Sequence, residues 1–165
     1  MAANAFNVQM LGIQDLVSEV EAFQTWVSAA NATEAKDSIY LYRETPPSAT
    51  KWAVLAKDDS WRWQRQTSGA GLVAGMPSAQ CRLEFWQTVS AYSEAAIVNF
   101  LDEVAGIIGG ALDIHGGTGA RAEVIDAIEE VPHAMRDAGQ RPTYRFKIGS
   151  DRGYMIAFLI KRRNR

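Results

Sequence analysis

The stretch that decides the fold spans residues 81–112 and reads CRLEFWQTVSAYSEAAIVNFLDEVAGIIGGAL. Its first residues alternate between a mostly apolar and a mixed set, which is the period-2 pattern of a strand whose two faces meet different surroundings. The first set is Cys81, Leu83, Phe85, Gln87 and Val89, and the second is Arg82, Glu84, Trp86, Thr88 and Ser90. This segment therefore predicts a β-strand with one mostly apolar face.

The same stretch continues as a helix. Ser93 is a favourable N-cap, and Glu94 suits the first turn, where a carboxylate complements the helix dipole. Apolar residues then recur at the spacing of one helical face: Ile97, Phe100, Leu101, Val104, Ile107, Ile108 and Leu112. We expect this helix to end at Gly109-Gly110 or shortly after, in the glycine-rich segment His115–Gly119.

A second amphipathic helix is predicted nearer the N-terminus. Its apolar face consists of Ile13, Leu16, Val17, Val20, Phe23 and Val27. We expect it to end at Ala30–Asn31, where Asn can adopt the left-handed conformation of a helix C-terminus. Residues 1–10 are expected to form a flexible arm. A polar connector over residues 32–37 then leads to a short strand, Ile39–Tyr42.

The remaining segments predict strands. Lys51–Ala56 and Trp61–Thr67 flank the turn-forming residues Lys57–Ser60 and predict a hairpin, and the Gly-rich segment Ser68–Ser78 predicts a mobile loop. The last third predicts strands at Ala122–Ile128, Thr143–Ile148 and Tyr154–Lys161, with a turn at Asp151–Gly153. This order favours an α+β fold, a mostly antiparallel sheet with two main amphipathic helices packed on one face.

Length and composition indicate one globular domain over residues 1–165. The chain is 47% hydrophobic and 22% charged, and its formal net charge of -2 gives no general attraction to nucleic acid or an anionic membrane. No apolar stretch approaches the roughly 18 residues that span a bilayer, and residues 1–10 have no features of a secretory signal. Cys81 is the only cysteine, so an internal disulfide is excluded. We expect Cys81 to be a small core residue in a reducing cytoplasm.

Signals for catalysis are weak. The segment His115–Gly119 lacks the terminal lysine and hydroxyl residue of a phosphate-binding loop, and it follows a helix where such a loop precedes one. The only histidines are His115 and His133, and there is no G-x-S-x-G elbow, so neither a hydrolytic triad nor a closed zinc site is indicated. Asp58-Asp59 and Glu129-Glu130 are typical of solvated charges at strand ends. We expect no catalytic residue, no metal and no cofactor.

Two basic segments leave nucleic-acid binding open as an alternative. Trp61–Arg65 interleaves aromatic and basic residues, as stacking surfaces for single strands do, although Trp61 and Trp63 fit a core position equally well. The tail Lys161–Arg165 is compactly basic and is compatible with a pore through which nucleic acid passes. The net charge and the lack of a recognition motif weigh against general nucleic-acid recognition. A single-stranded nucleic-acid-binding module is therefore the alternative from a different class.

Several segments in order resemble the tail-terminator (tail-completion) proteins of tailed bacteriophages. They are the helix and strand Phe23–Ala30 and Ile39–Tyr42, the later helix Asn99–Val104, and the terminal strand Tyr154–Ile160. The resemblance covers most of the chain, with the long central helix and the closing strand in the corresponding places. The segments 68–78 and 129–140 have no counterpart in it.

The resemblance implies a structural, non-enzymatic virion protein of the tail or neck, made in the host cytoplasm. Such proteins form a homo-oligomeric ring, typically a hexamer, that caps the tail tube and joins it to head-completion (neck) proteins. DNA passes through the lumen, and no membrane is involved. Ring closure requires unlike patches of neighbouring subunits to meet, and neighbours would cover exposed strand edges. Candidate subunit or partner contacts are Arg82, Glu84, Trp86, Lys161, Arg162, Arg163 and Arg165. Another head–tail connector or tube protein is the alternative within this class.

Overall fold

The computed structural model describes residues 5–41, 48–57, 62–64, 67–68, 71–72, 76–78, 80–115, 127–130 and 144–161. Its helices are α1 (Ala5–Ser18), α2 (Glu21–Trp26), α3 (Ala32–Lys36) and α4 (Glu94–His115). Its strands are β1 (Ile39–Leu41), β2 (Lys51–Lys57), β3 (Arg62–Gln64), β4 (Thr67–Ser68), β5 (Gly71–Leu72), β6 (Met76–Ser78), β7 (Gln80–Thr88), β8 (Ala127–Glu130), β9 (Arg145–Ile148) and β10 (Asp151–Lys161).

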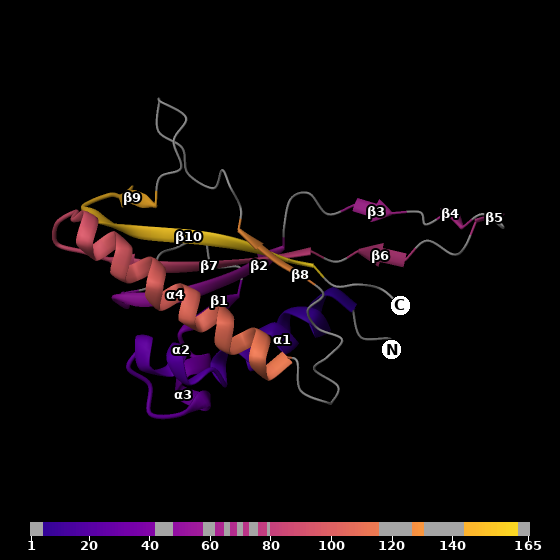
Figure 1. The fold of residues 1–165 in the computed structure, drawn as a ribbon, viewed down its shortest axis with the longest axis horizontal. Coiled ribbons are helices and arrows are strands. Elements are labelled where there is room, and N and C mark those ends of the chain that lie inside the picture. The colour runs from indigo at the N-terminus through magenta and orange to yellow at the C-terminus, as the bar shows by residue number, and fades with distance from the viewer. Residues whose placement is uncertain are drawn as a thin grey trace.

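The main sheet has six strands in the order β1-β2-β7-β10-β8, and β9 pairs with the other end of β10 (Figure 1). β1 and β2 run parallel, and the other pairs of this sheet are antiparallel. The long strands β7 and β10 form its centre, with Phe85 opposite Ile156. The predicted α+β class, a mostly antiparallel sheet with two main helices against one face, is confirmed.

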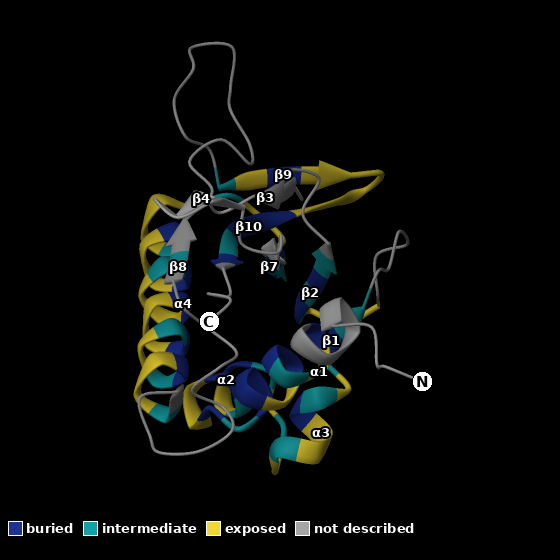
Figure 2. Cartoon of the chain, turned by 90° about the vertical axis from the view of Figure 1, so that its right-hand side faces the viewer, coloured by how far each residue is buried: buried dark blue, intermediate teal, exposed yellow. Residues whose placement is uncertain are grey.

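One large core fills the space between the helices and the sheet. Cys81, Leu83 and Phe85 of β7 face this core, as their alternation predicts. The other buried members from α1, α2, α4, β2 and β10 include Ile13, Leu16, Val20, Phe23, Trp26, Leu55, Phe100, Val104, Ile107, Tyr154 and Ile160. Phe85 contacts Phe23 and Trp26 edge to face, with ring centroids 6.4 and 5.8 Å apart. Figure 2 shows the buried side of α4 turned toward the sheet and its exposed side turned outward.

Helix α4 ends at His115, the first residue of the glycine-rich segment in which its end is predicted. It continues through Gly109 and Gly110 because packing against α1, α2 and the sheet outweighs the low helix propensity of glycine. A Cβ atom at Gly110 would lie 2.6 Å from Val20 Cγ1, so a side chain there would hold α4 away from the loop between α1 and α2.

Helix α4 also corrects the expectation that no stretch is long and apolar enough to span a bilayer. Residues 94–114 meet that criterion by length and composition. A helix packed in a protein core passes the same test, and Phe100, Val104 and Ile107 of α4 are buried against the sheet. One helix that passes this test is therefore weak evidence for a membrane span.

The single helix predicted over residues 13–27 is divided into α1 and α2. The backbone leaves the helical conformation at Val20, where ψ is 118°. Ser18 Oγ donates to the carbonyl of Asp15, and Gln24 Nε2 donates to the carbonyl of Ser18, so side chains satisfy carbonyl groups of the last turn of α1. Since α1 begins at Ala5, residues 5–10 are helical and do not form the predicted arm.

The connector predicted at residues 32–37 contains the short helix α3. Asn31 is the N-cap of α3. The prediction that Asn31 ends a helix in the left-handed conformation is wrong. Asn31 Oδ1 accepts from Glu34 N at 3.0 Å, and Glu34 Oε2 accepts at 2.9 Å from the N–H of Ala30, one residue before the position that a capping box uses. The left-handed residue is Ser28, with φ of 59°. Asn suits both roles, so its presence alone did not distinguish a helix start from a helix end.

The hairpin predicted between residues 51–56 and 61–67 is wrong, because β2 pairs with β7 along its whole length. Two short antiparallel pairs follow, β3–β6 and β4–β5. In the second pair Ser68 lies opposite Gly71. The segment predicted as a loop at residues 68–78 therefore contains β5 and β6. Figure 1 shows these short pairs projecting beyond the end of the main sheet as an extension of β2 and β7.

The C-terminal strands differ from their prediction in where they turn. The turn between β9 and β10 is formed by Gly149 and Ser150, not by residues 151–153, and Gly149 has φ of 59°. Glycine is the usual first residue of such two-residue turns because it adopts positive φ without strain. Gly153 lies inside β10 instead, where a Cβ would be 1.9 Å from the carbonyl oxygen of Gln87 and 2.7 Å from the ring of Phe146. Of the strand predicted at residues 122–128, Ala127 and Ile128 lie in β8, and residues 122–126 lie outside the described residues.

Candidate assembly surfaces

The sheet face turned away from the helices, called here the outer sheet face, carries an aromatic cluster. Trp52 and Trp86 are cross-strand partners whose rings stack with centroids 6.0 Å apart and an interplanar angle of 10°. Phe146 of β9 packs edge to face on Trp86, with centroids 4.7 Å apart. The cluster also contains Tyr40, Val54, Met155 and Ala157, and none of its members comes from a described helix.

Three predicted contact residues lie in one row on this outer sheet face. Trp86 Nε1 donates to Glu84 Oε2 at 2.8 Å, and Arg82 Nε lies 2.7 Å from Glu84 Oε1. The Arg82 N–H does not point at the oxygen, so this contact is an ion pair without a hydrogen bond. The side chains of Arg82 and Glu84 are 31% and 16% exposed. The three side chains are therefore partly buried and contact one another. The charges of Arg82 and Glu84 offset each other, which leaves less charge for a partner than the sequence suggests.

The predicted basic tail starts at the end of the central strand β10. Lys161 is its last residue, opposite Ala127 on one side and Gln80 on the other. The other predicted contacts of the tail lie outside the described residues: Arg162, Arg163 and Arg165. Of the aromatic and basic segment 61–65, residues 62–64 form β3, where Trp63 is opposite Pro77. Because Leu159 is the partner of Arg82, Lys161 lies two residues further along β10, so the basic tail starts at the same end of the sheet as the row of Arg82.

The exposed edge at β1 offers little backbone to a further strand. β1 has three residues, and Gln14 Nε2 donates to the carbonyl of Ile39 at 3.1 Å from the neighbouring helix α1. Short edges with occupied backbone groups are a known protection against added strands. Assembly through this edge is therefore disfavoured.

The outer face of α4 carries two of the four exposed large hydrophobic side chains among the described residues. Val98 and Leu112 are 55% and 45% exposed, and only 28% of the apolar window of this helix is buried. The exposed residues of α4, which form this outer face, are Glu94, Ala95, Val98, Asn99, Asp102, Glu103, Ala105, Gly106, Gly109, Leu112 and Asp113. A Cβ atom at Gly106 or Gly109 would meet no atom within 4 Å. The described residues therefore leave the small and apolar residues of the outer face of α4 uncovered.

The charges of α4 are all negative. Its sequence contains Glu94, Asp102, Glu103 and Asp113, and no lysine or arginine. Glu94 pairs with Arg145, and Glu103 Oε2 lies 3.3 Å from Lys51 Nζ. No residue in the described ranges forms an ion pair with Asp102 or Asp113.

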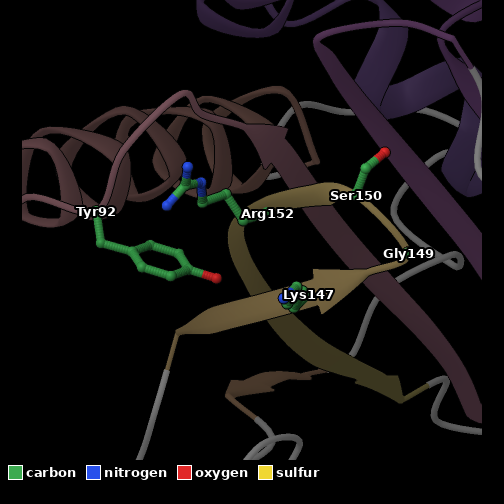
Figure 3. Close-up of a pocket in the computed structure, with 5 residues that line it drawn as sticks. All are labelled: Tyr92, Lys147, Gly149, Ser150 and Arg152. Carbon is green, nitrogen blue, oxygen red and sulfur yellow. The ribbon is translucent and has the colours of Figure 1, made fainter.

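A basic pocket of about 330 Å³ lies at the β9–β10 hairpin, lined by Tyr92, Lys147, Gly149, Ser150 and Arg152 (Figure 3). Lys147 and Arg152 are direct cross-strand partners. Arg152 reaches from β10 toward Tyr92, with Cζ 6.0 Å from the ring centroid. Tyr92 is fixed in turn, because its hydroxyl donates to the carbonyl of Phe146.

Sequence reasoning missed this basic pocket. The segment 145–152, RFKIGSDR, contains three basic residues and one acidic residue, and its glycine places the turn. The turn was assigned to residues 151–153, so Lys147 and Arg152 were not recognised as partners. The sequence does contain a signal for this pairing. Lys147 lies two residues before Gly149 and Arg152 two residues after Ser150, so a two-residue turn at Gly149-Ser150 makes the two cations partners.

The titratable groups considered for chemistry do not converge. Cys81 is fully buried, and desolvation raises its pKa to about 12, so the thiolate that a nucleophile requires does not form near neutral pH. His115 ends α4, and His133 lies outside the described residues. Within the described ranges, no group of three His, Cys, Asp or Glu side chains is placed to hold a metal ion.

Comparison with known proteins identifies no relative. No protein-family model, no curated protein and no solved structure matches the chain. Its function is therefore argued from the surfaces described above.

Proposed function

We propose that the protein is a structural, non-enzymatic component that assembles with copies of itself into a ring. The observation that carries this proposal is the outer face of α4, where apolar and small residues face solvent along a helix of 22 residues. Contiguous exposed apolar surface on a folded chain is typical of a site for a macromolecular partner. Burial of Val98 and Leu112 against a neighbour would contribute about 1.5–3 kcal/mol for each side chain that becomes fully covered.

The glycines of the outer face of α4 support the same conclusion. Glycine inside a helix costs about 1 kcal/mol relative to alanine. Gly110 has an internal reason, the contact with Val20, but Cβ atoms at Gly106 and Gly109 would be in open space. Glycines at these two positions allow the backbone of another chain to approach α4 closely.

The type of assembly that we propose is that of phage tail terminators. The long α4 between β7 and β8, and the long closing strand β10, support the resemblance in element order. In this proposal six copies form a ring that caps the tail tube in the virion. The ring joins the tube to head-completion proteins, and DNA passes through its lumen.

The experiment is to size the purified full chain by light scattering across a concentration series, alone and with Val98→Asp. The wild-type chain is expected to form a discrete oligomer, and Val98→Asp to shift it to monomer, because a carboxylate would be buried in an apolar contact. Thr33→Asp, on the exposed side of α3, is the matched control and should assemble like the wild type. A wild-type chain that stays monomeric at all concentrations and is absent from virions would contradict the proposal.

A further inference from the structure

We propose that the outer face of α4 docks on the basic pocket of the β9–β10 hairpin in a second copy of this chain. This inference rests on the self-assembly proposed above and names the two surfaces that meet. The occupant is a neighbouring subunit, because one chain carries both an acidic helical surface and a basic hairpin.

The acidic partner is the outer face of α4. Asp102 and Asp113 are eleven residues apart, which is about three turns of helix, so both carboxylates project from the same side. Gly106 and Gly109 lie between them on that side. The described residues provide no ion-pair partner for either aspartate.

The basic partner is the pair Lys147 and Arg152. Two like charges directly opposite each other in an antiparallel pair are destabilising unless an anion lies near both. The described part of the chain places no carboxylate within 4.0 Å of either cation. A carboxylate from a neighbouring α4 therefore neutralises a charge pair for which the described ranges supply no ion-pair partner.

The positions of the two surfaces suit a head-to-tail contact. Figure 2 shows α4 along one side of the molecule, while the turn that joins β9 to β10 projects toward the opposite side. A contact between two different patches of identical chains repeats from copy to copy and closes into a ring when the rotation between copies allows it. Complementary charge sets the orientation of such a contact.

The test is a charge exchange between the two surfaces. One variant carries Asp102→Lys and Asp113→Lys, and the other carries Lys147→Glu and Arg152→Glu. Each variant alone should lose at least roughly 100-fold in association constant, because like charges then meet at every contact. An equimolar mixture should assemble again, because the basic α4 of one variant meets the acidic hairpin of the other.

A matched control for the α4 variant carries Glu21→Lys and Asp37→Lys, which changes the net charge by the same amount but lies on α2 and beside α3. It should assemble like the wild type, and circular dichroism should show that all variants are folded. Sedimentation velocity measures each sample alone and the mixture.

The outcomes separate this inference from the proposed function. A wild-type oligomer that both variants also form would show that other surfaces meet, so this inference fails while the ring remains. Loss of assembly in the hairpin variant alone, or a mixture that stays monomeric, would overturn this inference and indicate that the pocket holds another anion, such as a phosphate. A wild type that is monomeric under all conditions would overturn both proposals.

Discussion

Tyr154 in the middle of the sheet holds Ser93 at the first turn of α4. The buried Tyr154 hydroxyl accepts a hydrogen bond from Ser93 N at 2.9 Å and donates one to the carbonyl of Ser93 at 3.2 Å. Ser93 Oγ in turn caps the helix by accepting from Ala96 N at 3.4 Å. One tyrosine therefore fixes where α4 begins relative to β10, and with it the orientation of the outer face of α4.

Replacement of Tyr154 by phenylalanine should destabilise the protein by about 1–3 kcal/mol, because the backbone groups of Ser93 lose their partner in a partly buried place. Urea unfolding measures the loss. Ser90→Ala, at an exposed position before the helix, is the control and should stay near the wild-type value. Equal midpoints for Tyr154→Phe and the wild type would show that the two hydrogen bonds add no net stability.

The glycines of α4 should respond in opposite directions to alanine. Gly110→Ala should destabilise the fold by about 1–3 kcal/mol, because the new methyl group would overlap buried Val20. Gly106→Ala should stabilise the monomer by up to about 1 kcal/mol, because the position is open and alanine favours the helix. Thermal unfolding of both variants, measured under conditions where the chain is monomeric, tests the pair. A stabilised Gly110→Ala variant would contradict the close packing of α4 on Val20.

Gly153→Ala should have the largest effect of any glycine substitution among the described residues. A Cβ at Gly153 would overlap the backbone of β7, which cannot move without breaking the central ladder, and the ring of Phe146 as well. We expect a loss of more than about 3 kcal/mol or failure to fold. Solubility and urea unfolding, compared with Gly149→Ala at the turn, measure it. A well-folded Gly153→Ala variant of wild-type stability would show that the β7 backbone and Phe146 do not pack on Gly153 as described.

Cys81 should make the protein less stable at alkaline pH. Its thiol has a pKa of about 12 in the folded protein, raised by burial from the model-compound value of 9.0, so the unfolded chain releases the proton first. Stability is therefore fully present below about pH 9, and each further pH unit removes up to about 1.4 kcal/mol until the folded pKa is reached.

The comparison of Cys81→Ala with the wild type isolates this contribution from other groups that titrate at high pH. Urea unfolding at about pH 8 and about pH 10.5 should show a smaller loss for the variant than for the wild type. A parallel decline in both proteins would mean that Cys81 is not shielded from water in the folded state.

The layers of the fold could be predicted from sequence because they depend on local periodicity. Alternation over Cys81–Val89 and the helical spacing from Ile97 to Ile108 both reflect a single buried face and are confirmed, whereas Leu112, predicted on the same helical face, is 45% exposed. The break at Val20 could not be predicted, since the apolar spacing continues through it and only side-chain bonds to backbone carbonyls end α1.

Strand pairing and the basic pocket depend on long-range contacts that periodicity does not encode. β2 pairs with β7 although another strand-like segment follows it more closely, which a local hairpin signal cannot reveal. The partnership of Lys147 with Arg152 depends on whether Gly149 or Gly153 forms the turn. Both glycines fit a turn in sequence, and only the packing of Phe146 on Gly153 decides between them.

Native mass spectrometry of the untagged full chain tests the central claim most directly, because it counts the subunits in each particle. The ring proposal predicts one dominant species at a single whole-number multiple of the 18.2 kDa chain, which Val98→Asp dissociates to monomer. A spectrum that contains only the monomer, or an open series of sizes with no preferred number, would contradict closure into a ring.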